Sequence, residues 1–487
     1  MKRPALLRCY IACFPLLFAA ALAAETGLVP VSSLILPVAA LNAVFIVLAL
    51  APVRGYVLAV STICLTAAGF IAVAYRVPFI AAAAAFNKSA GIIAFIAVVP
   101  AIAIPIRLGG YIDAMAAFVA RGSGSAAGAS GTGAGNRSRG TVFGFLALAG
   151  IELLMAIALN IGSIPTMQKL LDKARLPKRY LSLVYSAGYS SAMVLSPFDG
   201  LVNALILAAG TTYASFFSRG LVMAAAIMAA GCLLLLTDRR LARDGTPVME
   251  AAADMTGTQE RNAEAADSVV AAGTVQGRPG LKILELATHI VAMIAASAVV
   301  LRLVRPDNPA VVTALVILAW SFLWTKLLDI PWARVVGSGG EYANALAGFR
   351  AFLPFLVSAG FLGAMFAFTP IKPLLGGLLA SMAGLPRYLT LQLIILATAL
   401  LSLAGVHMMI PVAAIASALD PVALGLSPPG FALFLLTCWF VSMNVSPFVP
   451  FSAIVGEAIG EKPVTVALRY NSRMSALMLV VAPLLIR

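Results

Sequence analysis

The sequence has very little charge for its length. Asp, Glu, Lys and Arg make up only 11% of the 487 residues, whereas hydrophobic residues make up 62%. A soluble globular protein of this size needs more polar side chains to cover its surface, so the composition excludes that class. Apolar runs of about 18 to 23 residues recur along the chain, and each is long enough to cross a hydrocarbon core of about 30 Å as a helix. Because a transmembrane β-barrel would show short alternating segments instead, the sequence predicts an all-α polytopic membrane protein.

Acidic residues and recognisable cofactor motifs are also scarce. The chain has no Walker motif, no paired nucleotide-binding fingerprint and no zinc-type spacing, so we expect neither ATP-driven transport by this chain alone nor a bound cofactor or metal centre. Asp and Glu number 19 against 33 Lys and Arg, which gives a net charge of +14. The basic residues fall in short loops between apolar runs, which indicates cytoplasmic loops rather than a nucleic-acid partner. The five cysteines show no pairing pattern or metal-ligand spacing and are expected to pack among apolar side chains.

The basic residues also set the orientation of the chain. Lys2, Arg3 and Arg8 precede the first apolar run, which predicts a cytoplasmic N-terminus in the inner (cytoplasmic) membrane. The alternative is that residues 1–24 form a cleaved signal peptide. Retaining them as a first helix gives about 11 transmembrane helices in total. Apart from hairpins and broken helices, the predicted spans lie at 9–24, 28–50, 56–75, 88–106, 217–236, 283–301, 308–327, 351–369 and 464–485.

Two apolar segments do not fit a simple crossing. Basic residues flank 141–168 on both sides, so we expect a re-entrant hairpin that enters and leaves on the cytoplasmic side and turns near Gly150. A second hairpin is predicted over 386–420, with its turn near Gly405. A polar, Ala-rich stretch over 238–281 predicts a disordered cytoplasmic linker. The chain is thereby divided into an N-terminal half, 1–237, and a C-terminal half, 282–487.

A short repeat relates the two halves. Ser196-Pro197-Phe198 recurs as Ser446-Pro447-Phe448, 250 residues later, and Gly210 and Arg219 recur as Gly460 and Arg469 at the same distance. Upstream, Leu148-Ala149-Gly150-Ile151-Glu152 aligns with Leu403-Ala404-Gly405-Val406-His407, 255 residues later. An odd number of predicted crossings separates equivalent points, so the two copies are expected to have opposite orientations. This pattern is typical of an inverted-topology repeat, and it indicates a binding site where corresponding helices are interrupted.

Proline is expected to interrupt one helix in each half. Pro197 lies within the predicted helix 181–214 and Pro447 within 429–459. Each proline removes an amide donor and clashes with the preceding turn, which frees backbone groups near the middle of the membrane. A half-helix N-terminus suits an anion, whereas free carbonyls and serine hydroxyls suit a small cation. The two breaks are therefore expected to face each other across a central cavity.

The architecture of 11 spans, two re-entrant hairpins and Ser/Pro/Asn-containing breaks resembles the ion transporter superfamily. That superfamily includes divalent anion:sodium symporters, citrate carriers and arsenite permeases. The Ser-Asn-Thr signatures of its dicarboxylate symporters are absent, and Ser196-Pro197-Phe198-Asp199 and Asn444-Val445-Ser446-Pro447 occupy the comparable places. The resemblance implies alternating access, coupling to Na⁺ or H⁺, and a homodimer.

The candidate site residues have alternative interpretations. Glu152 and His407 either face a cavity as ion or proton sites or act as polar anchors between helices. His407 would suit proton coupling because histidine titrates near physiological pH. Asp199 either ligates a cation or caps the second half-helix, and Asn203 and Asn444 either contact substrate or join helices. The full predicted set is Gly150, Glu152, Ser191, Ser196, Pro197, Asp199, Asn203, Gly405, His407, Ser442, Asn444, Ser446 and Pro447, with Na⁺ placed at Ser196, Asp199, Asn444 and Ser446.

These observations favour a secondary active transporter, an ion-coupled carrier of a small anionic solute. One alternative is an intramembrane enzyme that uses Glu152, His407 and Asp199 on a lipid-borne substrate. No nucleophile–base pair at helical spacing supports that alternative. A third interpretation is an ion channel, which would be built from the same kind of fold.

Overall fold

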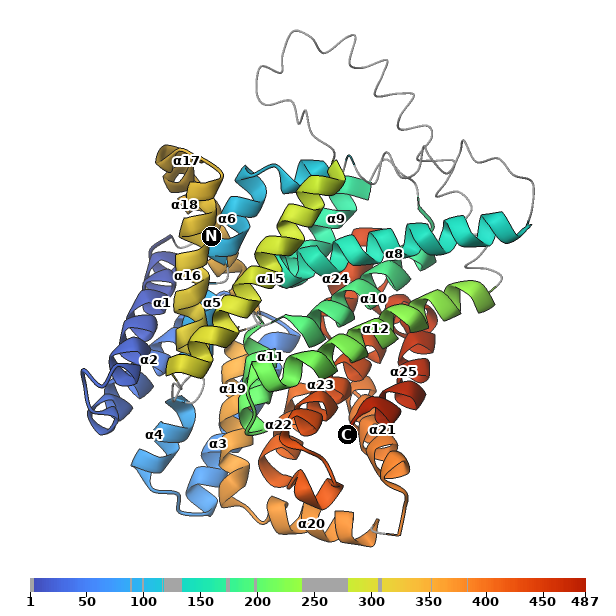
Figure 1. Ribbon diagram of the computed structural model, residues 1–487. Coiled ribbons are helices and arrows are strands. Elements are labelled where there is room, and N and C mark those ends of the chain that lie inside the picture. The colour runs from blue at the N-terminus through green and yellow to red at the C-terminus, as the bar shows by residue number, and fades with distance from the viewer. Residues whose placement is uncertain are drawn as a thin grey trace.

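The computed structural model describes residues 4–87, 90–98, 100–115, 117, 134–171, 176–196, 199–238, 279–304, 309–351, 353–382 and 384–487. Over these residues all the regular elements are helices (Figure 1), and the prediction of an all-α protein is confirmed. The predicted linker 238–281 lies outside the described residues except at its two ends. Pro197 and Phe198 also lie outside them.

The N-terminal helices follow the apolar runs of the sequence and end where glycine or proline interrupts them. Gly27 and Gly55 take positive φ angles of 68° and 72° in the first two connections, a conformation that glycine adopts without a steric penalty. The predicted span 88–106 is divided between two helices, with Pro100 in the first turn of the second, where proline is tolerated. The helices are α1 (Pro4–Glu25), α2 (Val31–Leu50), α3 (Tyr56–Ala74), α4 (Phe79–Asn87), α5 (Ala90–Val98) and α6 (Pro100–Leu108).

The rest of the N-terminal half contains a helix–turn–helix, an interrupted helix and a final helix. In order, the elements are α8 (Ala134–Leu159), the 3₁₀ turn η1 (Asn160–Gly162), α9 (Ser163–Leu171), α10 (Lys178–Leu195), α11 (Gly200–Ala208) and α12 (Tyr213–Thr237). Helix α8 runs without interruption through Gly150, so the predicted turn near that residue is wrong. The turn lies ten residues later, at Asn160, whose φ of +52° is tolerated because its side-chain Oδ1 accepts a hydrogen bond from the Ile161 amide at 2.6 Å.

The C-terminal half repeats this order after its own set of earlier helices. Those earlier elements are α15 (Pro279–Val304), α16 (Pro309–Leu327), α17 (Trp332–Gly337), α18 (Gly339–Gly348), α19 (Leu353–Met365) and α20 (Ile371–Ser381). They are followed by α21 (Arg387–Leu403), α22 (Met409–Ala418), α23 (Pro428–Val445), α24 (Pro450–Ile459), the π-helical segment η6 (Thr465–Asn471) and α25 (Ser472–Leu485). The chain turns between α21 and α22 at Gly405, which has a φ of +96°.

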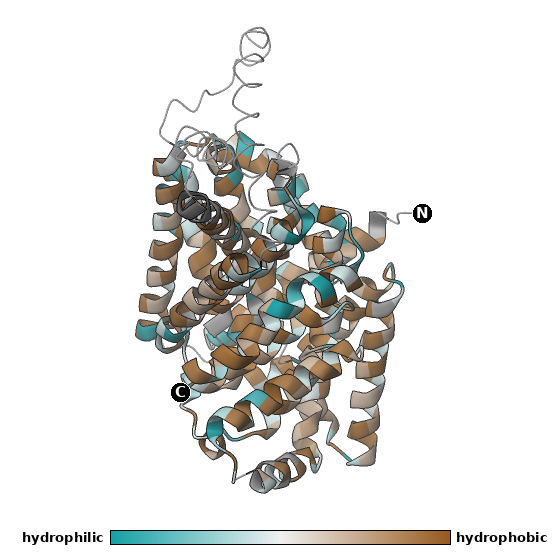
Figure 2. Ribbon diagram, turned by 90° about the vertical axis from the view of Figure 1, so that its right-hand side faces the viewer, coloured by the Kyte–Doolittle hydropathy of each residue, from teal (hydrophilic) through white to brown (hydrophobic). Residues whose placement is uncertain are grey.

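Helix length and composition make this a multi-pass membrane protein. Within the part of the chain that the structure describes, six helices are long and apolar enough to cross a membrane, and several shorter apolar helices accompany them. Large apolar side chains such as Phe70, Val73 and Leu303 are more than 70% exposed, which suits a surface in contact with lipid rather than water. In Figure 2 most of the helical ribbon has the brown colour of apolar residues. The six helices are Leu6–Glu25, Val31–Leu50, Val57–Ala74, Tyr213–Thr237, Gly280–Val304 and Pro428–Val445.

Apart from α20, which packs on α22, the helices are sorted into two bundles, and each bundle contains parts of both halves of the chain. Helices α1–α6 and α15–α19 pack mainly with one another, for example α3 on α19 and α5 on α16, and we call them the scaffold bundle. Helices α8–α12 and α21–α25 form the second group, the broken-helix bundle. In Figure 1 the scaffold helices α1, α2 and α16 lie on the left, and the broken-helix bundle lies on the right.

Candidate functional site

The first helix break lies between α10 and α11. Helix α10 ends at Leu195 and α11 begins at Gly200. Ser196 follows α10 in an extended conformation, and its hydroxyl donates a hydrogen bond at 3.4 Å to the carbonyl of Ile157, near the end of α8. The break is therefore tied to the helix–turn–helix that precedes it.

Asp199 occupies the start of α11 and is buried. Its Oδ2 accepts a hydrogen bond from the side-chain Nδ2 of Asn160 at 2.9 Å, and its Oδ1 accepts one from the Val202 backbone N–H at 3.4 Å. Asn203 donates from its side chain to the Asp199 carbonyl at 3.1 Å. These contacts give Asp199 the geometry of an N-terminal cap, which satisfies an otherwise free amide of the half-helix. The assignment of Asp199 and Asn203 as ligands of ion or substrate stays a prediction.

Tyr189 links this break to the C-terminal half. Its hydroxyl donates to Asn160 Oδ1 at 2.8 Å, and its ring stacks on that of Phe451 in α24, with centroids 5.3 Å apart. Asn160 and Tyr189 were absent from the predicted set. Asn160 had a sequence signal, since Asn160-Ile161-Gly162 is the one Asn/Gly pair that interrupts an otherwise apolar stretch there.

The second break lies between α23 and α24. Helix α23 ends at Val445, and Pro447 lies in the irregular segment before Pro450 opens α24. The Ser446 hydroxyl donates to the carbonyl of Ser402, near the end of α21, at 2.8 Å. The Ser446 carbonyl in turn accepts a hydrogen bond from the Ser452 hydroxyl at 2.7 Å. This break, like the first, is tied to the preceding helix–turn–helix by its serine.

The two serine contacts establish which positions of the hairpins correspond. Ser196 reaches the carbonyl three residues before Asn160, and Ser446 reaches the carbonyl three residues before Gly405. Asn160 and Gly405 are the positive-φ residues of their turns, and they lie 245 residues apart rather than the predicted 255. The predicted equivalence of Glu152 and His407 is therefore wrong. Short apolar matches recur by chance in a chain so rich in Ala and Leu, and one such match produced the alignment.

Glu152 lies in the middle of α8, two turns before Asn160, and has no exposed surface. Its Oε1 accepts a hydrogen bond from the Ser163 hydroxyl at 2.6 Å. His407 lies in the turn between α21 and α22 and is also buried, at 3% exposure. Its Nδ1 accepts a hydrogen bond from the Met409 amide at 3.3 Å, and its ring packs edge-on against Trp439 of α23 at 6.1 Å. The two groups therefore lie in different surroundings.

A buried row of polar contacts joins the first arms of the two broken helices. Asn444 of α23 accepts a hydrogen bond from Ser186 at 2.5 Å and donates to Ser190 at 3.0 Å. One turn before Ser186, nearer the start of α10, the Ser182 hydroxyl donates to the side-chain oxygen of Asn471, at the end of the π-helix, at 2.8 Å. Ser182, Ser186 and Ser190 were absent from the predicted set, although their spacing of four residues places them on one helix face. We call these five residues the serine seam.

The serine seam borders a narrow crevice. Ser190 and Asn444 line it together with Met474, Ser475 and Met478, and it is too narrow to hold a water molecule. Ser442 lies on α23 with its buried hydroxyl unpartnered among the described residues, and the Ser191 hydroxyl donates to the Ala224 carbonyl at 3.3 Å. This region is closed in the present conformation.

The four residues predicted to hold Na⁺ have different neighbours. Ser196 and Ser446 each contact their own hairpin, Asp199 contacts Asn160, and Asn444 belongs to the serine seam. Gly150 lies within α8, and an added Cβ there would meet no atom within 4 Å. The grouping of the four residues around one cation stays a prediction.

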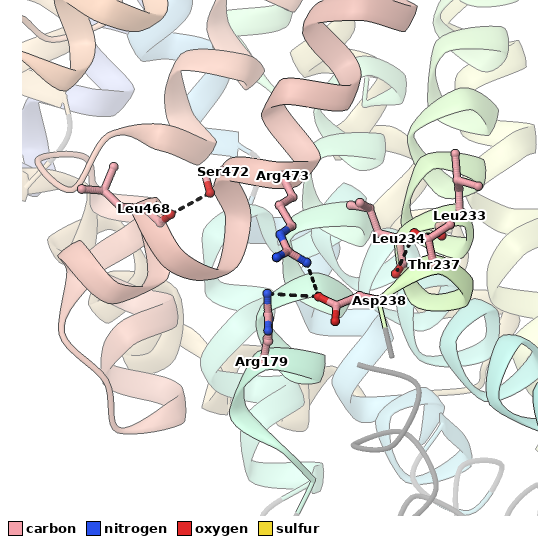
Figure 3. A network of polar contacts seen from close by, with 8 residues as sticks. All are labelled: Arg179, Leu233, Leu234, Thr237, Asp238, Leu468, Ser472 and Arg473. Carbon is pink, nitrogen blue, oxygen red and sulfur yellow. Dashed lines mark hydrogen bonds and ion pairs between the residues drawn. The ribbon is translucent and has the colours of Figure 1, made fainter. Parts of the chain in front are cut away.

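An ion-pair cluster holds one end of the broken-helix bundle. Asp238, which follows α12, pairs with Arg179 of α10 at 3.1 Å and with Arg473 of α25 (Figure 3). Its side chain is only 8% exposed. Beside it, Lys178 pairs with Glu461 at 3.1 Å. The basic residues at the start of α10 thus connect to the C-terminal half, in addition to any part they have in setting the topology.

Comparison with protein-family models gives no match, and comparison with curated proteins gives none either. Among solved structures, the chain is similar to the crystal structure of the YdaH transporter of Alcanivorax borkumensis. The two share 16% sequence identity with a TM-score of 0.43, and the similarity covers 78% of this chain and 85% of that one.

Proposed function

We propose that the protein is an ion-coupled secondary active transporter that carries a small anionic solute across the inner membrane by alternating access. The observation that carries this proposal is the pair of buried helix breaks, each held by a serine that donates to a carbonyl of the neighbouring hairpin. Interrupted helices leave backbone groups available to a ligand in a region where unpaired groups are otherwise costly.

The packing of the half-helices supports a shared site. Helix α11, which follows the first break, packs on α23, and α24, which follows the second break, packs on α10. The hairpin helices show the same exchange, since α9 packs on α24 and α22 on α11. Such reciprocal contacts are expected of two copies related by a pseudo-two-fold axis. We therefore propose that the halves 1–237 and 282–487 are inverted repeats whose breaks flank one binding site.

The contact between the two bundles includes small residues. Helix α19 of the scaffold bundle meets α22 of the broken-helix bundle at Gly363, where an added Cβ would lie 2.8 Å from the Cβ of Ala413. Small residues at such a contact let helix backbones approach closely. We propose that the broken-helix bundle moves relative to the scaffold bundle and exposes the breaks alternately to the two sides.

The anionic character of the solute is proposed from the helix termini. No side chain caps the first turn of α24 among the described residues, and we propose that its positive dipole end faces the anion. The buried hydroxyl and amide groups at the breaks add neutral hydrogen-bond donors. We further propose Na⁺ or H⁺ as the coupling ion, a cytoplasmic N-terminus and a homodimer, as the sequence resemblance implies.

A binding screen followed by a transport assay tests the proposal. Purified protein is heated with succinate, citrate, phosphate, sulfate or arsenite, with and without sodium and across pH, because a ligand of the native state raises its apparent stability. Any anion that stabilises the protein is then assayed for gradient-driven uptake into proteoliposomes. We expect Ser196→Ala and Ser446→Ala to reduce uptake, whereas Ser417→Ala, which removes an exposed hydroxyl that also donates to a carbonyl, leaves it unchanged. If no carboxylate or oxyanion is taken up along a gradient, the anion-carrier proposal fails.

A further inference from the structure

Glu152 is enclosed by the contact between α8 and α10. At the point of contact α10 carries Gly188, and a Cβ built there would lie 2.7 Å from both the Glu152 Cβ and the Ala149 carbonyl oxygen. Helix α10 therefore has no side chain at the position that faces the stem of Glu152. This close approach leaves the carboxyl group with no exposed surface.

The hydrogen bonds of this carboxyl group are incomplete. Oε1 accepts from the Ser163 hydroxyl at 2.6 Å, whereas Oε2 is buried and has no hydrogen-bond partner among the described residues. The ion pairs formed within that same part of the chain do not include Glu152. A buried carboxylate without a counter-charge costs several kcal/mol, so the carboxyl group is neutral in this conformation and holds a proton on Oε2.

The groups that face Glu152 do not supply a cation. Helix α8 packs against α6, α9, α10 and α12. Among the described residues, Tyr185 and Tyr189 of α10 are titratable side chains that interact with Glu152, and Tyr189 also interacts with Asp199. Among the described residues of α6, α9 and α12, no charged side chain forms an ion pair with it. One hydroxyl and one carboxyl also provide fewer oxygens than the shell that a hard metal cation requires.

A hydrogen-bonded chain connects these surroundings to the first break. Tyr189 donates to Asn160 Oδ1, and Asn160 donates to Asp199 Oδ2 at the start of α11. A change in the charge of Glu152 would act on Tyr189 and, through Asn160, on the residue that caps α11. The state of the carboxyl group and the geometry of the break are thus physically linked.

We infer that Glu152 is the proton-binding site of the transport cycle, which rests on the carrier function proposed above. When the bundle exposes Glu152 to water, its Oε2 takes a proton from water or returns one to it. When the bundle encloses it, as here, only the neutral form is stable. Each time the bundle moves with Glu152 enclosed, it therefore carries one proton with it. Ser163 is a positioning residue, because its hydroxyl fixes Oε1 and leaves Oε2 to carry the proton.

A transport assay separates proton coupling from a structural role of Glu152. Glu152→Gln keeps the shape and can still accept the Ser163 hydrogen bond, but it cannot release a proton. In proteoliposomes with succinate as the probe, we expect this variant to retain exchange of succinate between the two sides and to lose accumulation driven by a pH gradient. Accumulation equal to that of the wild type would overturn the inference. Absence of succinate movement in the wild type would count against the proposed function for this carboxylate, not against the proton site.

Infrared spectroscopy tests the proton site without any transported solute. In wild-type protein in lipid at neutral pH, we expect the stretching band of a protonated carboxylic acid, and we expect Glu152→Gln to remove it. Glu457→Gln, which alters an exposed glutamate on α24, is the matched control and should leave the band in place. Ser163→Ala should keep the band and move it to higher frequency, because the carbonyl loses a hydrogen bond. The inference is overturned if wild type and Glu152→Gln have the same spectrum in this region.

Discussion

The two helix breaks share a backbone arrangement but differ in the chemistry around it. In both, a serine donates to a carbonyl three residues before the turn of the preceding hairpin. The first break adds an acidic cap and its amide partner, Asp199 and Asn160, whereas the second adds the Ser452 hydroxyl and the ring of Phe448 near Gly405. The serine contact, which both breaks share, ties each break to its own hairpin, whereas the other polar groups differ between the two breaks. The charged group at the breaks thus belongs to the N-terminal half alone among the described residues.

The largest effect is expected where the halves differ most in packing. Gly188 faces Glu152, whereas Cys438, 250 residues later, places its thiol beside Thr398. Gly188→Ala introduces a methyl group 2.7 Å from a backbone oxygen, and such overpacking costs about 1–3 kcal/mol of unfolding free energy. Denaturant-induced unfolding in detergent micelles measures the loss. Gly150→Ala on the same pair of helices is the control and should not destabilise the protein, and equal losses would show that the α8–α10 contact is not tight.

The next effect separates the two interpretations of Asp199. Asp199→Ala removes both the cap of α11 and the acceptor of the Asn160 side chain, and it should cost about 1–2 kcal/mol of unfolding free energy. Asp199→Asn keeps one oxygen for the Val202 N–H but turns an NH2 group towards the Nδ2 donor of Asn160, so it should cost about 1 kcal/mol. If Asp199 also ligates a cation, Asp199→Asn will in addition abolish any stabilisation by sodium in a thermal-shift assay. Equal salt-free stability of Asp199→Ala and the wild type would contradict the capping geometry.

A smaller effect should distinguish the two equivalent serines. The Ser446 hydroxyl lies 2.8 Å from its acceptor and the Ser196 hydroxyl 3.4 Å, so Ser446 makes the stronger hydrogen bond. We expect Ser446→Ala to lower the free energy of unfolding by about 1 kcal/mol and Ser196→Ala by about half as much. Micelle unfolding of the two variants and of the double variant gives the comparison. The reverse order would mean that the two breaks are held differently.

The smallest effect concerns the arginines that share Asp238. The Arg179 side chain is 16% exposed and that of Arg473 is 55% exposed. Arg473→Gln should therefore cost at most about 0.5 kcal/mol, and less at high salt, because exposed ion pairs are weak and screened. Arg179→Gln should cost more, since it removes the better buried partner of a buried carboxylate. Unfolding at low and high salt tests the difference, and equal values for the two variants would argue against it.

The interruptions of the two long helices were readable from the sequence, because proline in a repeated Ser-Pro-Phe triplet has a direct effect on the backbone. The position of the first hairpin turn could not be predicted in this way. Glycine within an apolar helix is tolerated, as at Gly150, and asparagine at position 160 took the positive-φ position that glycine holds at 405. Local pattern alone does not decide between these two uses of a small or polar residue.

The serine seam and the two bundles show two further limits. Ser182, Ser186 and Ser190 were spaced for one helix face, yet their partner Asn471 lies 289 residues from Ser182, and no local rule connects them. The sorting of helices into two bundles was even less accessible. Lipid tails are as apolar as packed side chains, so hydrophobicity does not reveal whether a helix faces lipid or protein.

The π-helical segment Thr465–Asn471 determines which side of α25 faces the neighbouring helices. A π turn holds about one residue more than an α turn, so the residues after Asn471 are rotated by about 100° relative to a continuous α-helix. That rotation brings Ser475 to the carbonyl of Val441 on α23. A single-residue deletion within this segment would therefore leave every side chain of α25 intact in sequence, yet turn Ser475 away from its acceptor and present a different stripe of the helix to the bilayer.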